Sequence, residues 1–220
     1  MSIITNQLTT NIVEKILYSR CGWELNLNYD NDKIENIVNN IYKLERDKYS
    51  SDTGRTFIQK KGFHSKNLIN VPFFKPLIND ILKLVNNELA IILKRKDKYG
   101  NFAKNPNFYF VTDDIWTVIW RKGDFNAPHR HPDNHIAGAF YFKVPSSQNS
   151  GGELAISNIS TNQLPIHDTD MANGMSLRKL TPKLGHGIFF RSDLEHFVLP
   201  SYTDEDRICI ACNFKLKNIQ

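Results

Sequence analysis

Ala127-Pro-His-Arg-His-Pro-Asp-Asn-His135 runs directly into Ile136-Ala-Gly-Ala-Phe-Tyr-Phe142. The first segment carries three histidines and one aspartate within seven positions, and the second is an apolar, aromatic-rich run of β character. Imidazole and carboxylate groups gathered at the end of a strand can bind a metal ion. The two segments therefore predict half of a metal site, and the other half must come from elsewhere in the chain.

The size and composition are those of an ordinary globular protein. The chain has 220 residues and a mass of 25.4 kDa, with 40% hydrophobic and 23% charged residues, so we expect one domain over residues 1–220. No apolar run approaches the roughly 18 residues that span a bilayer. The N-terminus resembles no export signal, which predicts a cytoplasmic protein without a membrane partner.

The basic charge and the cysteines carry no separate function. The net charge is +5, but lysine and arginine are mostly scattered singly, so a nucleic-acid partner is not expected. Cys209 and Cys212 form a Cys-x-x-Cys motif within a β-branched, apolar segment. Residues three apart on a strand face opposite sides, so we expect two buried structural thiols rather than a zinc or redox pair.

Residues 1–108 are expected to be mainly a helical support. Alternating apolar residues over 23–29 predict one early strand, and Asp32 is the expected cap of a helix that ends near Arg46. A second amphipathic helix is expected to begin at Pro76 and to end before the basic cluster at 94–96. The segment over 47–70 is polar and contains two glycines, which indicates a loop or an irregular strand pair.

From residue 109 to residue 216 the pattern changes to short strands separated by turns. Helices followed by a run of strands predict an α+β protein whose core is a two-sheet barrel or jelly roll, with the N-terminal helices packed against one sheet. The expected strands cover residues 115–120, 136–144, 153–157, 187–190, 197–200 and 208–216.

The metal site is expected to combine neighbouring and distant ligands. On an extended strand His129 and His131 face the same side, and Asp133 is next on that side. His196, which follows a turn and precedes an apolar segment, is the candidate third ligand; the orientation of His135 stays open. Three imidazole or carboxylate ligands leave coordination positions free, which indicates a catalytic metal, and the ligand type favours non-haem Fe(II).

Arg207 lies eleven positions beyond His196, on the strand that follows. A guanidinium group in a barrel can pair with a carboxylate through two parallel hydrogen bonds. An organic acid that chelates the iron would find its charge partner there.

With these motifs in order, the sequence resembles the Fe(II)- and 2-oxoglutarate-dependent oxygenases, and more narrowly a family common in marine phages and bacteria that is related to prolyl hydroxylases. The resemblance covers roughly residues 50–216. It is carried by residues 61–66, 120–124, 129–132, 137–141, 151–154, 182–185, 189–192, 195–196 and 206–213.

The resemblance implies a double-stranded β-helix fold and a set of site residues. It makes His129 and His196 iron ligands, Arg207 the partner of the distal carboxylate of 2-oxoglutarate, and Tyr141 a hydrogen-bond donor to that carboxylate. The usual aspartate position holds His131, which we favour as the middle ligand; Asp133 stays open as its alternative. Trp120 stands where relatives often have tyrosine.

The implied activity is a hydroxylase-like dioxygenase that couples decarboxylation of 2-oxoglutarate to C–H oxidation of a small-molecule or peptidyl substrate, with O₂ as oxidant and ascorbate as an optional reductant. Its host would be a bacterial or phage-infected cell. Two alternatives remain: a three-histidine dioxygenase of cupin type without 2-oxoglutarate, and a jelly-roll module that only binds a ligand.

The remaining histidines and aromatic residues are expected to lie outside the site. His64, His167 and His186 fall in turn-like segments, which favours surface positions or positions behind the ligands. Four large aromatic residues are expected in the core rather than on a substrate surface: Trp116, Trp120, Phe189 and Phe190. The segments over 47–70 and 158–180 are expected to border the substrate.

Overall fold

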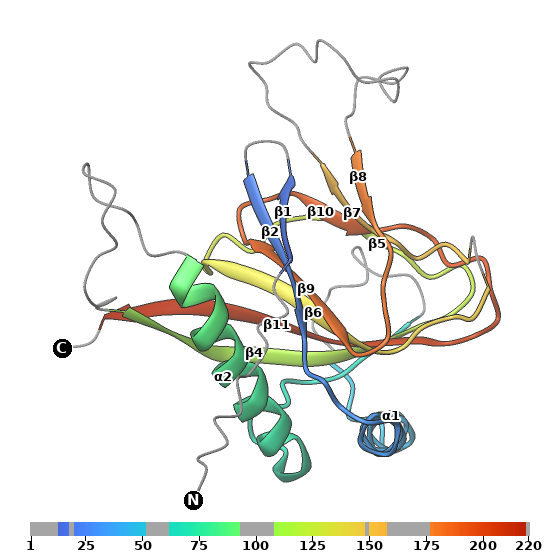
Figure 1. The fold of residues 1–220 in the computed structure, drawn as a ribbon. Coiled ribbons are helices and arrows are strands. Elements are labelled where there is room, and N and C mark those ends of the chain that lie inside the picture. The colour runs from blue at the N-terminus through green and yellow to red at the C-terminus, as the bar shows by residue number, and fades with distance from the viewer. Residues whose placement is uncertain are drawn as a thin grey trace, which may run out of the picture.

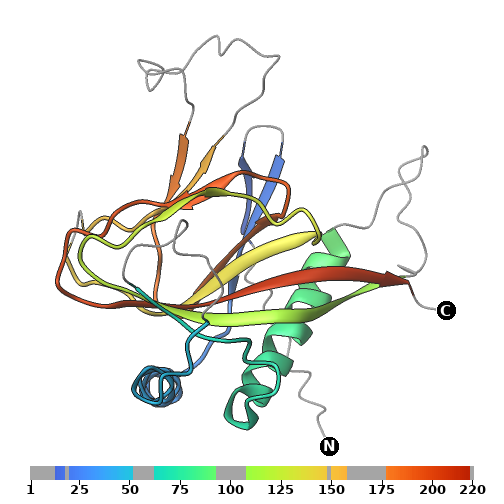
Figure 2. The ribbon, with the colours of Figure 1, turned by 180° about the vertical axis from the view of Figure 1, so that it is seen from behind.

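A computed structural model describes residues 13–17, 20–51, 62–92, 108–147, 150–157 and 177–218. Two antiparallel sheets lie face to face, and two helices cover the outer side of the larger sheet (Figures 1 and 2). The prediction of an α+β protein with a two-sheet jelly-roll core is confirmed. Within the described part of the chain, no helix is long and apolar enough to cross a bilayer.

The larger sheet has seven strands in the order β1-β2-β9-β6-β11-β4-β3, and the smaller has four in the order β5-β10-β7-β8. The bounds of the strands are β1 Val13–Leu17, β2 Arg20–Asn26, β3 Phe63–His64, β4 Phe108–Trp120, β5 Asn126–His129, β6 Ile136–Lys143, β7 Leu154–Ser157, β8 Leu177–Leu180, β9 His186–Arg191, β10 His196–Val198 and β11 Arg207–Asn218. All six strands expected beyond residue 109 are present, and β5 and β8 are additional.

Three strands of the N-terminal part join the larger sheet, so the description of residues 1–108 as mainly helical was incomplete. β2 pairs with β9, β1 pairs with β2, and β3 pairs with β4. The early strand was expected over 23–29 but ends at Asn26, because Asn28 takes a left-handed conformation with φ 53° that breaks the extended chain.

Helix α1 spans Asn31–Arg46, and its cap differs from the expected one. Asp30, not Asp32, is the N-cap: its backbone is extended and its carboxylate accepts a hydrogen bond from the N–H of Lys33 at 2.8 Å. Asp32 lies in the first turn instead, where a negative charge complements the helix dipole.

Helix α2 spans Lys75–Ile92 and follows the short 3₁₀ helix η2, Pro72–Phe74. Both helices contribute to the core on the outer face of the larger sheet. Ile41 and Ile81 are fully buried there, together with Phe140 and Ile210 from the sheet. Apolar residues at helical spacing thus meet strand residues at alternate positions, as burial of both apolar surfaces requires.

A second core lies between the two sheets and consists of inward-facing residues. Neighbouring residues of one strand divide between the two cores: Ile188 and Phe190 face inward, while Phe189 faces the helices. The cysteines do the same, since Cys209 belongs to the inner core and Cys212 to the outer one. Both are free and buried, which confirms the prediction of two structural thiols.

Candidate metal centre and cosubstrate pocket

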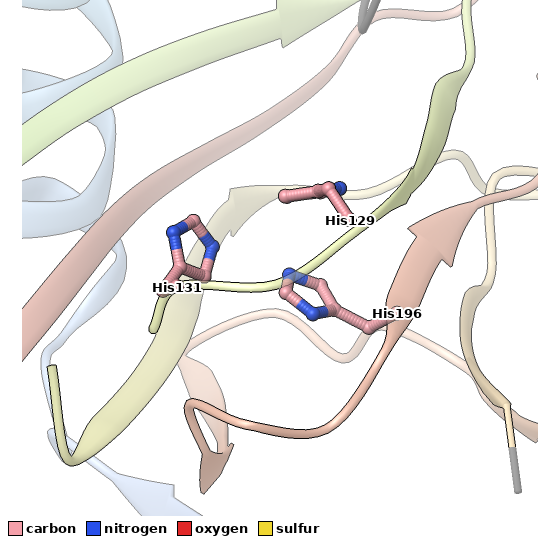
Figure 3. A group of neighbouring side chains, drawn as sticks. All are labelled: His129, His131 and His196. Atoms are coloured by element: carbon pink, nitrogen blue, oxygen red, sulfur yellow. The ribbon is translucent and has the colours of Figure 1, made fainter. Parts of the chain in front are cut away.

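Three histidines come together on the smaller sheet where β5 meets β10. His129 ends β5 and is the register partner of His196, which begins β10; their ring centroids lie 4.2 Å apart. His131 follows two residues after β5. One ring nitrogen from each of the three lies within 4.8 Å of the others, and Figure 3 shows the rings turned toward one another. This spacing suits one ion bound by three imidazoles.

Backbone carbonyls orient two of these rings. The Nδ1 atom of His129 lies 2.8 Å from the carbonyl oxygen of Ala127, and Nδ1 of His196 lies 3.0 Å from that of Leu194. A carbonyl oxygen only accepts, so each Nδ1 carries the proton and donates it. The other nitrogen, Nε2, keeps its lone pair for a metal.

His196 is held in its neutral form. Burial first, and then the neighbouring His129 and His131, lower the pKa of its imidazole to about 3, against an opposing contribution from the Leu194 carbonyl. A metal ligand must be neutral imidazole, so the surroundings favour the form that binds.

The other two candidates of the opening stretch lie outside the cluster. A turn closed by the N–H of Asn134 and the carbonyl of His131 follows immediately, and it leaves Asp133 exposed. His135 is also exposed, and its Nδ1 accepts a hydrogen bond from the N–H of Leu216 at 3.3 Å. The sequence left two ligand sets open, one with His131 and one with Asp133. The three side chains that lie close together are those of the set with His131.

Arg207 is a buried cation without a hydrogen-bond partner among the described residues. Its side chain is 2% exposed, and none of its three guanidinium nitrogens makes a hydrogen bond within the described residues. The group lies 5.3 Å from the centroid of the Trp120 ring, and burial lowers its pKa. A Cβ on Gly152 would come within 2.6 Å of Nη1, so this glycine leaves the guanidinium its room.

Tyr141 lies on the strand beside that of Arg207. It is buried on β6, pairs in register with Cys209 of β11, and lines the same cavity as Arg207. Burial raises the pKa of its phenol and Cys209 adds to this, while Arg207 acts in the opposite direction. The phenol therefore keeps its proton and can donate a hydrogen bond into the cavity.

One cavity of about 260 Å³ joins the histidine cluster to Arg207 and Tyr141. Trp116, Trp120 and Phe190 also line it, although they are at most 8% exposed. The prediction that the large aromatic residues lie in the core is confirmed: these three pack in the inner core and Phe189 packs in the outer one. That the three inner residues also line the cavity was not expected.

Sequence reasoning missed three further residues of the cavity wall, Asp114, Asn213 and His64. His64 lies in β3 rather than in a turn, and its ring stacks on Trp116 with centroids 5.5 Å apart. The sequence did contain a signal for Asp114. It lies two positions before Trp116 and four before Val118, so on an extended strand it faces the same side as Trp116 and Trp120. His186 begins β9 away from the cluster.

Two predictions concern segments that lie wholly or partly outside the described residues. His167 lies outside the described residues, as do positions 52–61 and 158–176 of the segments expected to border the substrate. The remainder of the second segment, from Leu177 to Leu180, is strand β8 rather than a loop.

A jelly roll that presents three imidazoles to one point, beside a buried arginine, has the form of a non-haem metal oxygenase. Residues 114–213 match the family model described as "Putative 2OG-Fe(II) oxygenase". The matched segment contains all three clustered histidines, Tyr141 and Arg207. This part of the chain is thus similar to the Fe(II)- and 2-oxoglutarate-dependent oxygenases.

Solved structures of similar fold include a prolyl-4-hydroxylase from Pseudomonas putida, with 14% identity, a TM-score of 0.57, and 88% of this chain and 91% of that chain covered. A viral collagen prolyl hydroxylase from Paramecium Bursaria Chlorella virus-1 has 17% identity, a TM-score of 0.53, and coverage of 88% and 96%. HygX from Streptomyces hygroscopicus has 12% identity, a TM-score of 0.58, and coverage of 88% and 82%. No curated protein sequence matches the chain.

Proposed function

We propose that this protein is an oxygenase that hydroxylates an aliphatic C–H group of a small-molecule or peptidyl substrate, with Fe(II) bound by the three histidines and 2-oxoglutarate bound at Arg207. The observation that carries the proposal is Arg207 itself. A buried guanidinium whose nitrogens have no partner among the described residues lies in the same cavity as a cluster of three metal-binding side chains.

The metal would be held by ring nitrogens of His129, His131 and His196. The carbonyl groups behind His129 and His196 support this role, because they leave the Nε2 lone pairs of these rings free. Three protein ligands leave coordination positions for small molecules. Bound Fe(II) supplies the O₂ chemistry that decarboxylates 2-oxoglutarate and oxidises the substrate.

The cosubstrate's distal carboxylate would lie between Arg207 and Tyr141. A buried charge without a counterion is costly, and no ion pair joins Arg207 to a described carboxylate. A carboxylate can accept two parallel hydrogen bonds from the guanidinium and a third from the Tyr141 hydroxyl. Trp120 has no hydroxyl to offer; its ring lies beside the guanidinium and limits its movement.

The apolar walls of the cavity would exclude water from the reaction. Trp116, Trp120 and Phe190 enclose the space between the two sheets. Water excluded from this space cannot screen the pairing of Arg207 with a carboxylate or compete for the oxidant.

One observation favours a second candidate function. The cluster consists of three histidines and contains no carboxylate. Three-histidine dioxygenases that need no cosubstrate bind their metal with the same set of ligands. Such an enzyme, or a jelly-roll module that only binds a ligand, would leave the charge of Arg207 without compensation. We therefore place 2-oxoglutarate dependence first.

The fold accommodates both kinds of substrate. A prolyl hydroxylase of similar fold from Trichoplax adhaerens is in complex with a peptide fragment, and HygX has hygromycin B bound. The residues that line the cavity of this chain must therefore decide between a small-molecule and a peptidyl substrate.

The test is calorimetric titration of 2-oxoglutarate into Ni(II)-loaded protein, in which no turnover occurs. Arg207→Gln should weaken cosubstrate binding by about 100-fold or more, because a buried charged hydrogen-bond pair is worth roughly 3 kcal/mol. Arg191→Gln is the matched control, since Arg191 is exposed and its guanidinium pairs with Asp193 at 3.1 Å.

Nickel affinity measured in parallel shows that each variant is folded. Unchanged 2-oxoglutarate affinity in Arg207→Gln, with nickel still bound, would exclude the proposed cosubstrate site. Wild-type protein that binds nickel but no 2-oxoglutarate would favour the three-histidine alternative.

A further inference from the structure

The cavity wall formed by β4 and β11 is a ladder of register pairs with opposite charges at its two ends. Alternate residues of the paired strands face inward, and the pairs are Trp120 with Arg207, Val118 with Cys209, Trp116 with Ala211, and Asp114 with Asn213. Six residues of strand separate the Arg207 end from the Asp114 end, which is roughly 20 Å.

The histidine cluster lies toward the Asp114 end of this ladder. The ring centroid of His131 is 6.3 Å from that of Trp116, and its Nδ1 is 3.5 Å from Nδ2 of Asn213. If Arg207 holds the cosubstrate, the half of the cavity beyond the cluster is left for the substrate. Its wall then decides which substrates fit.

Asp114 is the only carboxylate among the described residues that line the cavity. Its neighbour Asp113 faces away, is exposed, and pairs with Lys215 at 3.1 Å. Asp114 accepts a hydrogen bond from Nδ2 of Asn213 at 3.0 Å, but no described cation forms an ion pair with it. A half-buried carboxylate of this kind favours a positive charge beside it.

Aromatic faces lie beside Asp114. Trp116 is the next inward-facing residue of β4 after Asp114, and the ring of His64 stacks on its indole at an interplanar angle of 19°. The face of an indole attracts cations, and its surface also packs against methylene groups. Arg130, the remaining cation at the cavity apart from Arg207, is exposed and lies 3.6 Å from Glu195.

We infer that the substrate carries a cationic nitrogen at the end of an aliphatic stem, with the nitrogen at Asp114 and the stem along Trp116 toward the histidine cluster. The inference rests on the proposed function, because it assigns the Arg207 end to 2-oxoglutarate. The same chemistry is offered by a free basic amino acid and by a lysine side chain within a peptide.

Asp114 has a second effect that the experiment must separate from substrate binding. Through Asn213 it orients an amide that reaches His131. Asp114→Asn keeps a carbonyl oxygen for Asn213 and removes only the charge. If this variant binds nickel within about twofold of wild type, the metal site is intact. If Asp114 only supports the metal site through Asn213, the substitution should weaken nickel binding instead.

The experiment compares ligands that differ only in the charged nitrogen. L-lysine and L-norleucine form the free pair; Nα-acetyl-lysine N-methylamide and its norleucine analogue form the peptidyl pair. Binding is titrated into metal-free protein and into protein loaded with Ni(II) and 2-oxoglutarate. We expect the lysine member of one pair to bind roughly tenfold to hundredfold more tightly, as a charge-assisted hydrogen bond provides.

Asp114→Asn should abolish this preference, and the adjacent Asp113→Asn should preserve it. Equal binding of the lysine and norleucine members in both pairs, or an undiminished preference in Asp114→Asn, would overturn the inference. If 2-oxoglutarate fails to bind while metal-free protein still prefers lysine, the proposed function fails and the cation site stands.

Discussion

The two faces of β11 differ in a way that separates folding from function. Ile208, Ile210, Cys212 and Phe214 face the helices, and this side is apolar throughout. Arg207, Cys209, Ala211 and Asn213 face the cavity, where Arg207 and Asn213 bury side-chain atoms that have no hydrogen-bond partner among the described residues. Unsatisfied buried polar groups are rare and costly, so the inner face is built for a ligand and the outer face for stability.

The largest expected effect on the cavity comes from His131, which lies opposite the inner face of β11. His131→Ala should weaken Ni(II) binding by about 100-fold or more, since loss of a direct ligand exceeds the roughly 10- to 100-fold effect of residues behind the ligands. Asp133→Ala is the matched control two positions away; it should leave nickel affinity unchanged, because Asp133 is exposed and outside the cluster. The reverse pattern in calorimetric titration would assign the middle ligand to Asp133.

A smaller effect of a different kind is expected on the outer face. Ile210 is fully buried among the helices and the sheet, so Ile210→Val should lower the free energy of unfolding by about 1 kcal/mol. Urea denaturation measures this loss. Nickel and 2-oxoglutarate affinities should stay within about twofold of wild type; a large loss of either would show that the two faces are coupled.

The strands and the ligands could be predicted from sequence because each has a local signal. Apolar runs rich in aromatic or β-branched residues placed β6 and β11, and His129-x-His131 with a distant His196 and Arg207 gave the elements of the site. The cap of α1 was misplaced by two residues, because Asp30 and Asp32 are both good capping residues and only the backbone conformation decides between them.

The substrate half of the cavity could not be found in this way. Asp113 and Asp114 are chemically identical, and their roles differ only through the register of β4 on β11, which turns one outward to Lys215 and the other inward. Trp116 likewise packs in the inner core and lines the cavity at once, so its burial does not exclude a binding role. Register and sheet packing are properties of the assembled fold.

The central claim is that this cavity couples 2-oxoglutarate to iron, and the most direct measurement is succinate formation from 2-oxoglutarate by purified protein in air. Wild-type protein should form succinate only with Fe(II). The rate of succinate formation should fall at least about 100-fold in both His196→Ala and Arg207→Gln. The control variant His135→Ala should keep the wild-type rate. Iron-loaded wild-type protein that consumes no 2-oxoglutarate, or equal rates in the His196 and Arg207 variants and wild type, would contradict the claim.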